Sequence, residues 1–144
     1  MNPTDLIHEF VAAFNRQDVP ALLACFTDDA VYHDNFYGRH AGQAGLRQMF
    51  ERMFREGRDY AWTLHMVLAD AHRGAAEWSF SYTVTNAVPR SAGRKVRMSG
   101  MSLFELKGGK IAGYREYTDM GLALLQLGFA PESLAKVLAR RLPA

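Results

Sequence analysis

The chain has 144 residues and a mass of 16.2 kDa, which suits one compact domain and is too short for two. Hydrophobic residues make up 49% and charged residues 22%, which excludes a disordered tail, a coiled coil and a collagen-like repeat. Seventeen Lys and Arg against fifteen Asp and Glu leave a formal charge of +2, too balanced for a protein that binds nucleic acid or an anionic membrane.

The cysteine count and the lack of a recognisable targeting pattern narrow the class of protein further. Cys25 is the single cysteine, so we expect no internal disulfide and no Cys-rich metal site. No apolar run is long enough to span a membrane, and residues 1–5 carry an acid and a proline where a signal peptide is basic and then apolar. We therefore expect a cytoplasmic protein. His33 and Asp34 are adjacent on an expected strand and point to opposite faces, so we expect no metal. We also expect no cofactor.

The first half of the chain predicts mainly helices. Residues 3–16 follow an N-cap and a proline and place apolar side chains at helical spacing. A second short helix is expected from Asp18, and a short strand over residues 30–34. After a glycine-containing loop over residues 38–45, an apolar stripe predicts a third helix, which Gly57 ends.

The second half predicts a sheet. Four segments rich in Thr, Val and aromatic residues are separated by short turns, over residues 60–72, 75–86, 94–107 and 110–118. Short turns between long strands indicate an antiparallel meander, and two small helices follow over 120–127 and 131–142. Helices followed by a long curled sheet indicate an α+β fold. The helices would cover one sheet face and leave a cone-shaped hollow, where a ligand site is expected.

Several fragments of these elements are similar to those of a known group. They are Phe14–Asp18, Phe26–Asp34, Tyr37–Arg39, Gly109–Asp119 and Leu124–Gly128. In this order the chain resembles, over nearly its whole length, the nuclear-transport-factor-2-like superfamily. That group includes ketosteroid isomerases, limonene-epoxide hydrolases, scytalone dehydratases and SnoaL-like polyketide cyclases. The resemblance implies a single SnoaL-like domain over residues 1–144, folded as a cone-shaped α+β barrel whose curved antiparallel sheet wraps around the N-terminal helices.

The resemblance also implies roles for two pairs of residues. Asp34 matches the proton-shuttling aspartate of the isomerases. Tyr32 and Asp34 stand where the hydrolases hold the attacking water with a tyrosine and an amide. Tyr114 and Glu116 match a hydrolase tryptophan and its water-activating aspartate.

Four other positions depart from these patterns. Ser81 and Thr83 fall where the hydrolases have an arginine and a second aspartate. Phe10 and Met101 fall where the isomerases have two hydrogen-bond donors, and neither of these side chains can donate. Neither activity is therefore expected as such.

Strand alternation supports a shared site. It places Tyr32 and Asp34 on one face of their strand, and Tyr114 and Glu116 on one face of theirs. Two carboxyl groups in an apolar cavity raise at least one pKa, as general acid–base chemistry requires. Asp34, Glu116 and Tyr32 are the catalytic candidates, although a strand-end cap would also explain Asp34 and a surface salt bridge Glu116.

The candidate substrate-binding residues lie mostly on the expected sheet. They are Tyr114, His65, Trp62, Thr83 and Ser81. His65 beside Asp34 would be an alternative base, as the resemblance to the dehydratases suggests, although a wall histidine is the plainer interpretation. Trp62 is first of all a packing residue.

Two functions from different classes remain. The first is a cofactor-independent enzyme that performs acid–base chemistry, of isomerase, dehydratase, cyclase or hydrolase type, on an apolar oxygenated substrate in the cone pocket. The alternative is a non-catalytic module that binds a small ligand or dimerises. Alternation also predicts an aromatic stripe of Trp78, Phe80 and Tyr82 on the outer sheet face. An exposed stripe of this size is normally covered, so we expect a homodimer through that face.

Overall fold

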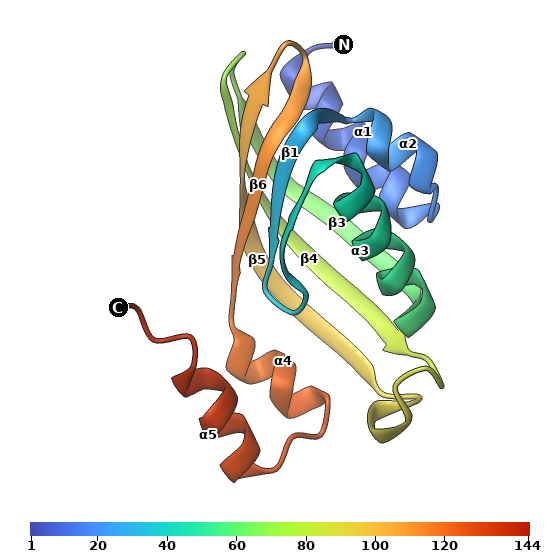
Figure 1. The fold of residues 1–144 in the computed structure, drawn as a ribbon, viewed down its shortest axis with the longest axis vertical. Helices are drawn as coiled ribbons and strands as arrows, with labels where there is room; N and C mark the ends of the chain where they lie inside the picture. The colour runs from blue at the N-terminus through green and yellow to red at the C-terminus, as the bar shows by residue number, and fades with distance from the viewer.

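Three helices lie against one face of a six-stranded curved sheet in the computed structural model, which describes residues 1–144 (Figure 1). They are α1 (Pro3–Asn15), α2 (Val19–Ala24) and α3 (Gly42–Glu56). α1 begins where the Asn2 side chain accepts a hydrogen bond from the Asp5 N–H group, and α2 where Asp18 accepts one from Ala21. These two caps match the helix starts expected from the sequence.

The sheet is an antiparallel meander with one parallel addition. Its strands are β1 (Phe26–Asp34), β2 (Gly38–Ala41), β3 (Gly57–Ala69), β4 (Arg73–Val84), β5 (Lys95–Lys107) and β6 (Lys110–Thr118). They are arranged in the order β2-β1-β6-β5-β4-β3. The meander from β3 to β6 is confirmed. β1 pairs with β6 in parallel, and that pairing sets Tyr32 beside Tyr114.

The predicted loop over 38–45 was wrong, because its first four residues form β2 and its last four begin α3. Gly38 has a φ of 78°, a left-handed conformation that glycine adopts without strain. The chain therefore turns back sharply, and β2 pairs with β1 in antiparallel register from Asp34 opposite Gly38 to Val31 opposite Ala41. The expected strand over 30–34 is also longer than predicted and begins at Phe26.

Aromatic side chains fill the space between helices and sheet. The ring of Phe10 on α1 lies 5.3 Å from that of Trp62 and 5.8 Å from that of Tyr114, measured between centroids. Asn15, the last residue of α1, holds β3 in place: its side chain donates to the Trp62 carbonyl and accepts from the Trp62 N–H group, both at 2.9 Å. These contacts fix the position of Trp62 inside the cone.

The expected outer aromatic stripe was wrong. Trp78, Phe80 and Tyr82 project from β4 toward the helices and line a cavity. Alternation had grouped these residues correctly but could not tell which group faces inward. The large apolar side chains that do lie exposed on the outer face are Met66, Leu68, Met101 and Tyr117.

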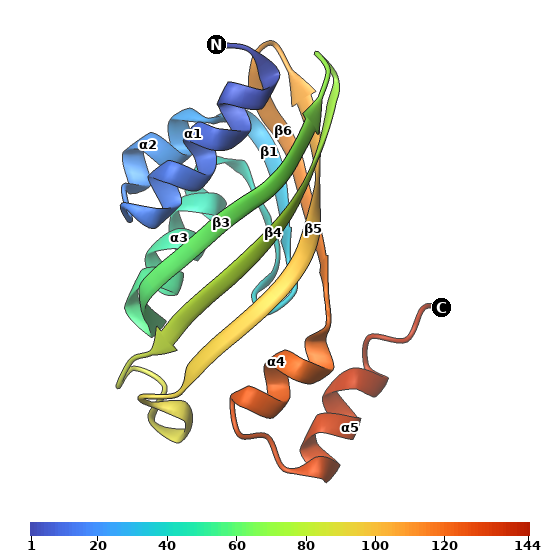
Figure 2. The same ribbon diagram turned by 180° about the vertical axis from the view of Figure 1, so that it is seen from behind.

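Two further helices lie beyond one end of the sheet (Figure 2). α4 (Met120–Gln126) follows β6, and α5 (Pro131–Ala139) packs beside α4. The side chain of Arg141, after α5, donates to the carbonyl oxygen of Asn35 in the turn after β1. The C-terminal segment thus reaches back to the rim of the cone. None of the five helices is long and apolar enough to cross a membrane.

Candidate active site

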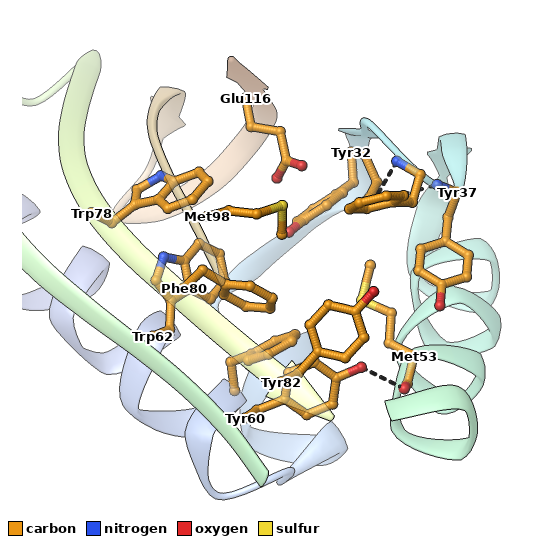
Figure 3. Close-up of a pocket in the computed structure, with 13 residues that line it drawn as sticks. Tyr32, Tyr37, Met53, Tyr60, Trp62, Trp78, Phe80, Tyr82, Met98 and Glu116 are labelled. Atoms are coloured by element: carbon orange, nitrogen blue, oxygen red, sulfur yellow. Dashed lines mark hydrogen bonds between the residues drawn. The ribbon is translucent and has the colours of Figure 1, made fainter. Parts of the chain in front are cut away.

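A cavity lies inside the cone, between the sheet and helices α1 and α3 (Figure 3). Its volume, counted as the space open to the centres of water-sized molecules, is about 50 Å³. This is room for about three to five waters or a small organic group. Eleven of its thirteen lining residues are hydrophobic, and the two others are acids, Asp34 and Glu116. The lining residues are Phe14, Tyr32, Asp34, Phe36, Tyr37, Met53, Tyr60, Trp62, Trp78, Phe80, Tyr82, Met98 and Glu116.

Asp34 is the last residue of β1 and caps the turn that follows. One of its carboxylate oxygens, Oδ2, accepts hydrogen bonds from the backbone N–H groups of Phe36 at 3.3 Å and Tyr37 at 3.4 Å. Burial raises the pKa of Asp34 from 3.8 to about 6, although these two hydrogen bonds and the charge of Arg141 act in the opposite direction. The cap considered as the alternative for Asp34 is present, and the same carboxyl group also lines the cavity.

Glu116 projects into the cavity from β6 (Figure 3). Its Oε1 accepts from the Tyr114 hydroxyl group at 2.7 Å, and its Oε2 accepts from the Asn35 N–H group at 3.3 Å. Burial, and then the negative charge of Asp34, raise the pKa of Glu116 from 4.5 to about 8. The surface salt bridge considered for Glu116 is therefore absent.

A buried chain of hydrogen bonds leads to Glu116. Trp78 Nε1 donates to Ser102 Oγ at 2.8 Å, Ser102 Oγ donates to the Tyr114 hydroxyl at 2.8 Å, and that hydroxyl donates to Glu116. Ser102 is fully buried on β5. Gly100 makes room for the Trp78 ring, because a Cβ at that position would lie 2.8 Å from it. Three neighbouring strands thus hold the Glu116 carboxyl group in one orientation.

We expect Ser102→Ala to lower the free energy of unfolding by about 1–3 kcal/mol, because it leaves the buried Trp78 N–H group without an acceptor. Ser99→Ala is the matched control, since Ser99 lies on the same strand with an exposed side chain. Urea denaturation of both variants measures the difference. A Ser102→Ala variant as stable as the control would mean that the chain of hydrogen bonds contributes nothing to stability.

The two tyrosines predicted at the site lie together. The rings of Tyr32 and Tyr114 stack with centroids 4.1 Å apart and planes 18° apart. Tyr32 lines the cavity, and burial is the main cause that raises the pKa of both hydroxyl groups well above 10. Both therefore stay protonated and able to donate hydrogen bonds at neutral pH. Trp62 also lines the cavity, and its buried Nε1 has no acceptor in the protein.

Four predicted substrate-binding residues do not line the cavity. Tyr114 is buried beside Tyr32, where its hydroxyl group is bonded to Ser102 and Glu116, and the other three face away from the cavity. His65 is exposed on β3, and its Nε2 lies 2.6 Å from Ser79 Oγ on the outer face, so it cannot serve as the alternative base beside Asp34. Ser81 and Thr83 alternate with the inward residues of β4 and also face outward. The positions of β4 that do face the cavity are Trp78, Phe80 and Tyr82.

On β5, as on β4, the position considered from the sequence is one residue away from the position that faces inward, and Ser102 was therefore missed. Met101 is exposed on the outer face of β5, so the inward position there belongs to Ser102. The cavity-lining residues Tyr60 and Met98 were not predicted either. A signal for Ser102 existed in the alternation of β5, where it shares a face with Phe104 and Leu106.

No three His, Cys, Asp or Glu side chains gather where they could hold a metal ion. The chemistry that the described residues offer is proton transfer and hydrogen bonding. It comes from two acids whose environments separate their pKa values and from tyrosine hydroxyl groups that stay protonated.

The helices pack inside the curve of the sheet, and a cavity with two acids lies between them. This is the cone-shaped α+β fold of the nuclear-transport-factor-2-like group. The chain belongs to the SnoaL-like domain family, whose model matches residues 7–114. Among curated proteins no sequence matches it.

Solved structures of similar fold come from several bacteria. A proposed polyketide cyclase from Pseudomonas putida is 28% identical, with 88% of this chain and 98% of that chain covered and a TM-score of 0.74. An LEH-like epoxide hydrolase from Mycobacterium tuberculosis is 19% identical, with 95% of each chain covered and a TM-score of 0.71. A protein from Catenulispora acidiphila with a ketosteroid isomerase-like fold, in complex with trimethylamine, is 16% identical, with 92% and 98% covered and a TM-score of 0.76.

Proposed function

We propose that the protein is a cofactor-independent enzyme that moves a proton on a small oxygenated substrate, with Asp34 as the base and Glu116 as the acid. The observation that carries this proposal is the pair of acids in one apolar cavity with pKa values of about 6 and about 8. Near pH 7 the pair is expected to hold one proton, and the proposed mechanism assigns it to Glu116, whose pKa the charge of Asp34 also raises. Two acids that are held in opposite protonation states are the arrangement that general acid–base catalysis needs.

The proposed reaction follows from the protonation states of the two acids. Ionised Asp34 removes a proton from a carbon next to a substrate carbonyl group, and the C–H bonding pair becomes the C=C bond of an enol. Protonated Glu116 donates its proton to the carbonyl oxygen as negative charge develops there. The hydroxyl group of Tyr32, which also lines the cavity, supplies a further donor for that oxygen. Isomerisation, dehydration and aldol-type cyclisation all begin with this step.

We expect the protein to catalyse exchange of the α-hydrogens of a small ketone such as cyclopentanone in D₂O, measured by proton NMR. The rate should rise with pH through about 6, as Asp34 ionises, and fall through about 8, as Glu116 loses its proton. Because the two acids interact, the two limbs of the profile belong to the pair. A ketone that binds without any exchange between pH 6 and 8 would favour the ligand-binding alternative.

We further propose a homodimer through the outer sheet face. Its support is the patch of Met66, Leu68, Met101 and Tyr117, which are between 41% and 61% exposed. Sedimentation equilibrium tests the proposal, and a monomer at micromolar concentration would contradict it.

A further inference from the structure

A second, larger cavity lies at the mouth of the first. The centres of water-sized molecules can occupy about 430 Å³ of it, against about 50 Å³ inside the cone. The two cavities share Phe36, Tyr37 and Tyr82 as lining residues, so these aromatic side chains form the border between them. We name the outer cavity the vestibule.

The vestibule is built from segments far apart in the sequence. Helix α3, strand β4 and the short 3₁₀ helix η1 (Pro89–Ser91) line it on one side, and the α4–α5 connection over residues 127–130 on the other. Ser91 Oγ donates to the Leu127 carbonyl oxygen at 2.8 Å, and the Arg94 guanidinium packs against Gly128. These contacts hold the connection between α4 and α5 against η1 and its flanking residues, and so fix the shape of the vestibule.

The lining of the vestibule carries more positive than negative charge. Glu56 is the single acid of the lining, and Arg52 Nε neutralises it at 3.0 Å while the Tyr37 hydroxyl donates to it at 3.3 Å. Arg90 also lines the vestibule, and no acid lies within ion-pair distance of it. One guanidinium group therefore remains without a counter-charge beside a cavity that has room for much of a small organic molecule.

We infer that the vestibule binds the part of the substrate that stays outside the cone, and that Arg90 binds a single anionic group on that part, such as a carboxylate. This inference rests on the proposed function, because it assigns the reacting end to the inner cavity. That cavity has too little space for a fused ring system, whereas the vestibule has room for a chain or a ring. The substrate class is an amphipathic acid with a small carbonyl end and a carboxylate several bonds away.

A matched pair of probes tests this inference. 6-Oxoheptanoate carries a methyl ketone and a carboxylate, and 6-oxoheptanamide differs from it only in charge. We expect the wild-type protein to bind the carboxylate roughly tenfold more tightly than the amide at low salt, because a charge-assisted hydrogen bond to Arg90 is lost with the amide. Saturation-transfer NMR in D₂O gives both affinities, and α-hydrogen exchange is followed in the same samples.

Arg90→Gln should reduce the preference for the carboxylate to less than twofold and leave the affinity for the amide unchanged. Arg73→Gln is the control for net charge, since Arg73 is the exposed first residue of β4, at the opposite end of that strand from the vestibule residues Tyr82 and Val84. Equal binding of the two probes by the wild type, a preference that survives in Arg90→Gln, or no binding of either probe would overturn the inference.

The two readouts separate this inference from the proposed function. A preference for the carboxylate that depends on Arg90, without exchange, supports the vestibule site and contradicts the enzyme. Exchange of both probes at equal affinity supports the enzyme and overturns the vestibule site.

Discussion

Asp34→Asn should reduce the rate of α-hydrogen exchange by about 10²–10⁴-fold at pH 7, because an amide cannot accept the proton that the ionised carboxylate removes. The variant keeps an oxygen that can accept the hydrogen bonds of the Phe36 and Tyr37 N–H groups, so the turn after β1 should persist. The measurement is the exchange rate by NMR, with circular dichroism to check the fold.

Asp28→Asn is the matched control for that variant. Asp28 lies on the same strand, exposed to solvent, and the same substitution there should leave the exchange rate within about twofold of the wild type. If Asp34→Asn retains the wild-type rate, Asp34 is not the base, and the turn that it caps is its only role.

Glu116→Gln should gain stability relative to the wild type as pH rises to 8, while it weakens catalysis. The pKa of Glu116 is raised in the folded state from 4.5 to about 8, so between these values the folded chain binds more protons than the unfolded chain. Stability therefore falls as pH rises through this range. Glutamine does not titrate, but its NH₂ group cannot accept the hydrogen bond that one of the two Glu116 oxygens accepts from Tyr114 or Asn35. That loss is the same at every pH, so relative to the wild type the variant should gain about 1–3 kcal/mol of stability between pH 4 and pH 8.

The measurement is the free energy of unfolding in urea at pH 4, 6 and 8. Glu77→Gln provides the control, because Glu77 is exposed on the outer face of β4. Its difference from the wild type should stay small and independent of pH. A Glu116→Gln variant that is destabilised equally at all three pH values would contradict the raised pKa and favour a purely structural role in the chain of hydrogen bonds from Trp78.

The pairing of the inward-facing residues of β1 and β6 was predictable from alternation alone. Tyr32 shares a face with Asp34 and Tyr114 with Glu116 because successive side chains of a strand point to opposite faces, and the structure places all four on the inner face. The same rule grouped Trp78 with Phe80 and Tyr82 but left two possible faces for the group. The expected face was wrong, and with it the positions of Ser81 and Thr83.

The helices, the meander and its order along the chain were determined by local signals: caps, apolar spacing and glycine turns. Only the tertiary structure decided which sheet face is inside, since that depends on how the helices pack. The parallel pairing of β1 with β6 brought Tyr32 beside Tyr114. Burial raised the pKa values of both Asp34 and Glu116, and the charge of Asp34 raised that of Glu116 further. The return of the C-terminal helices built the vestibule around Arg90. These features depend on contacts between residues distant in sequence, which no local pattern records.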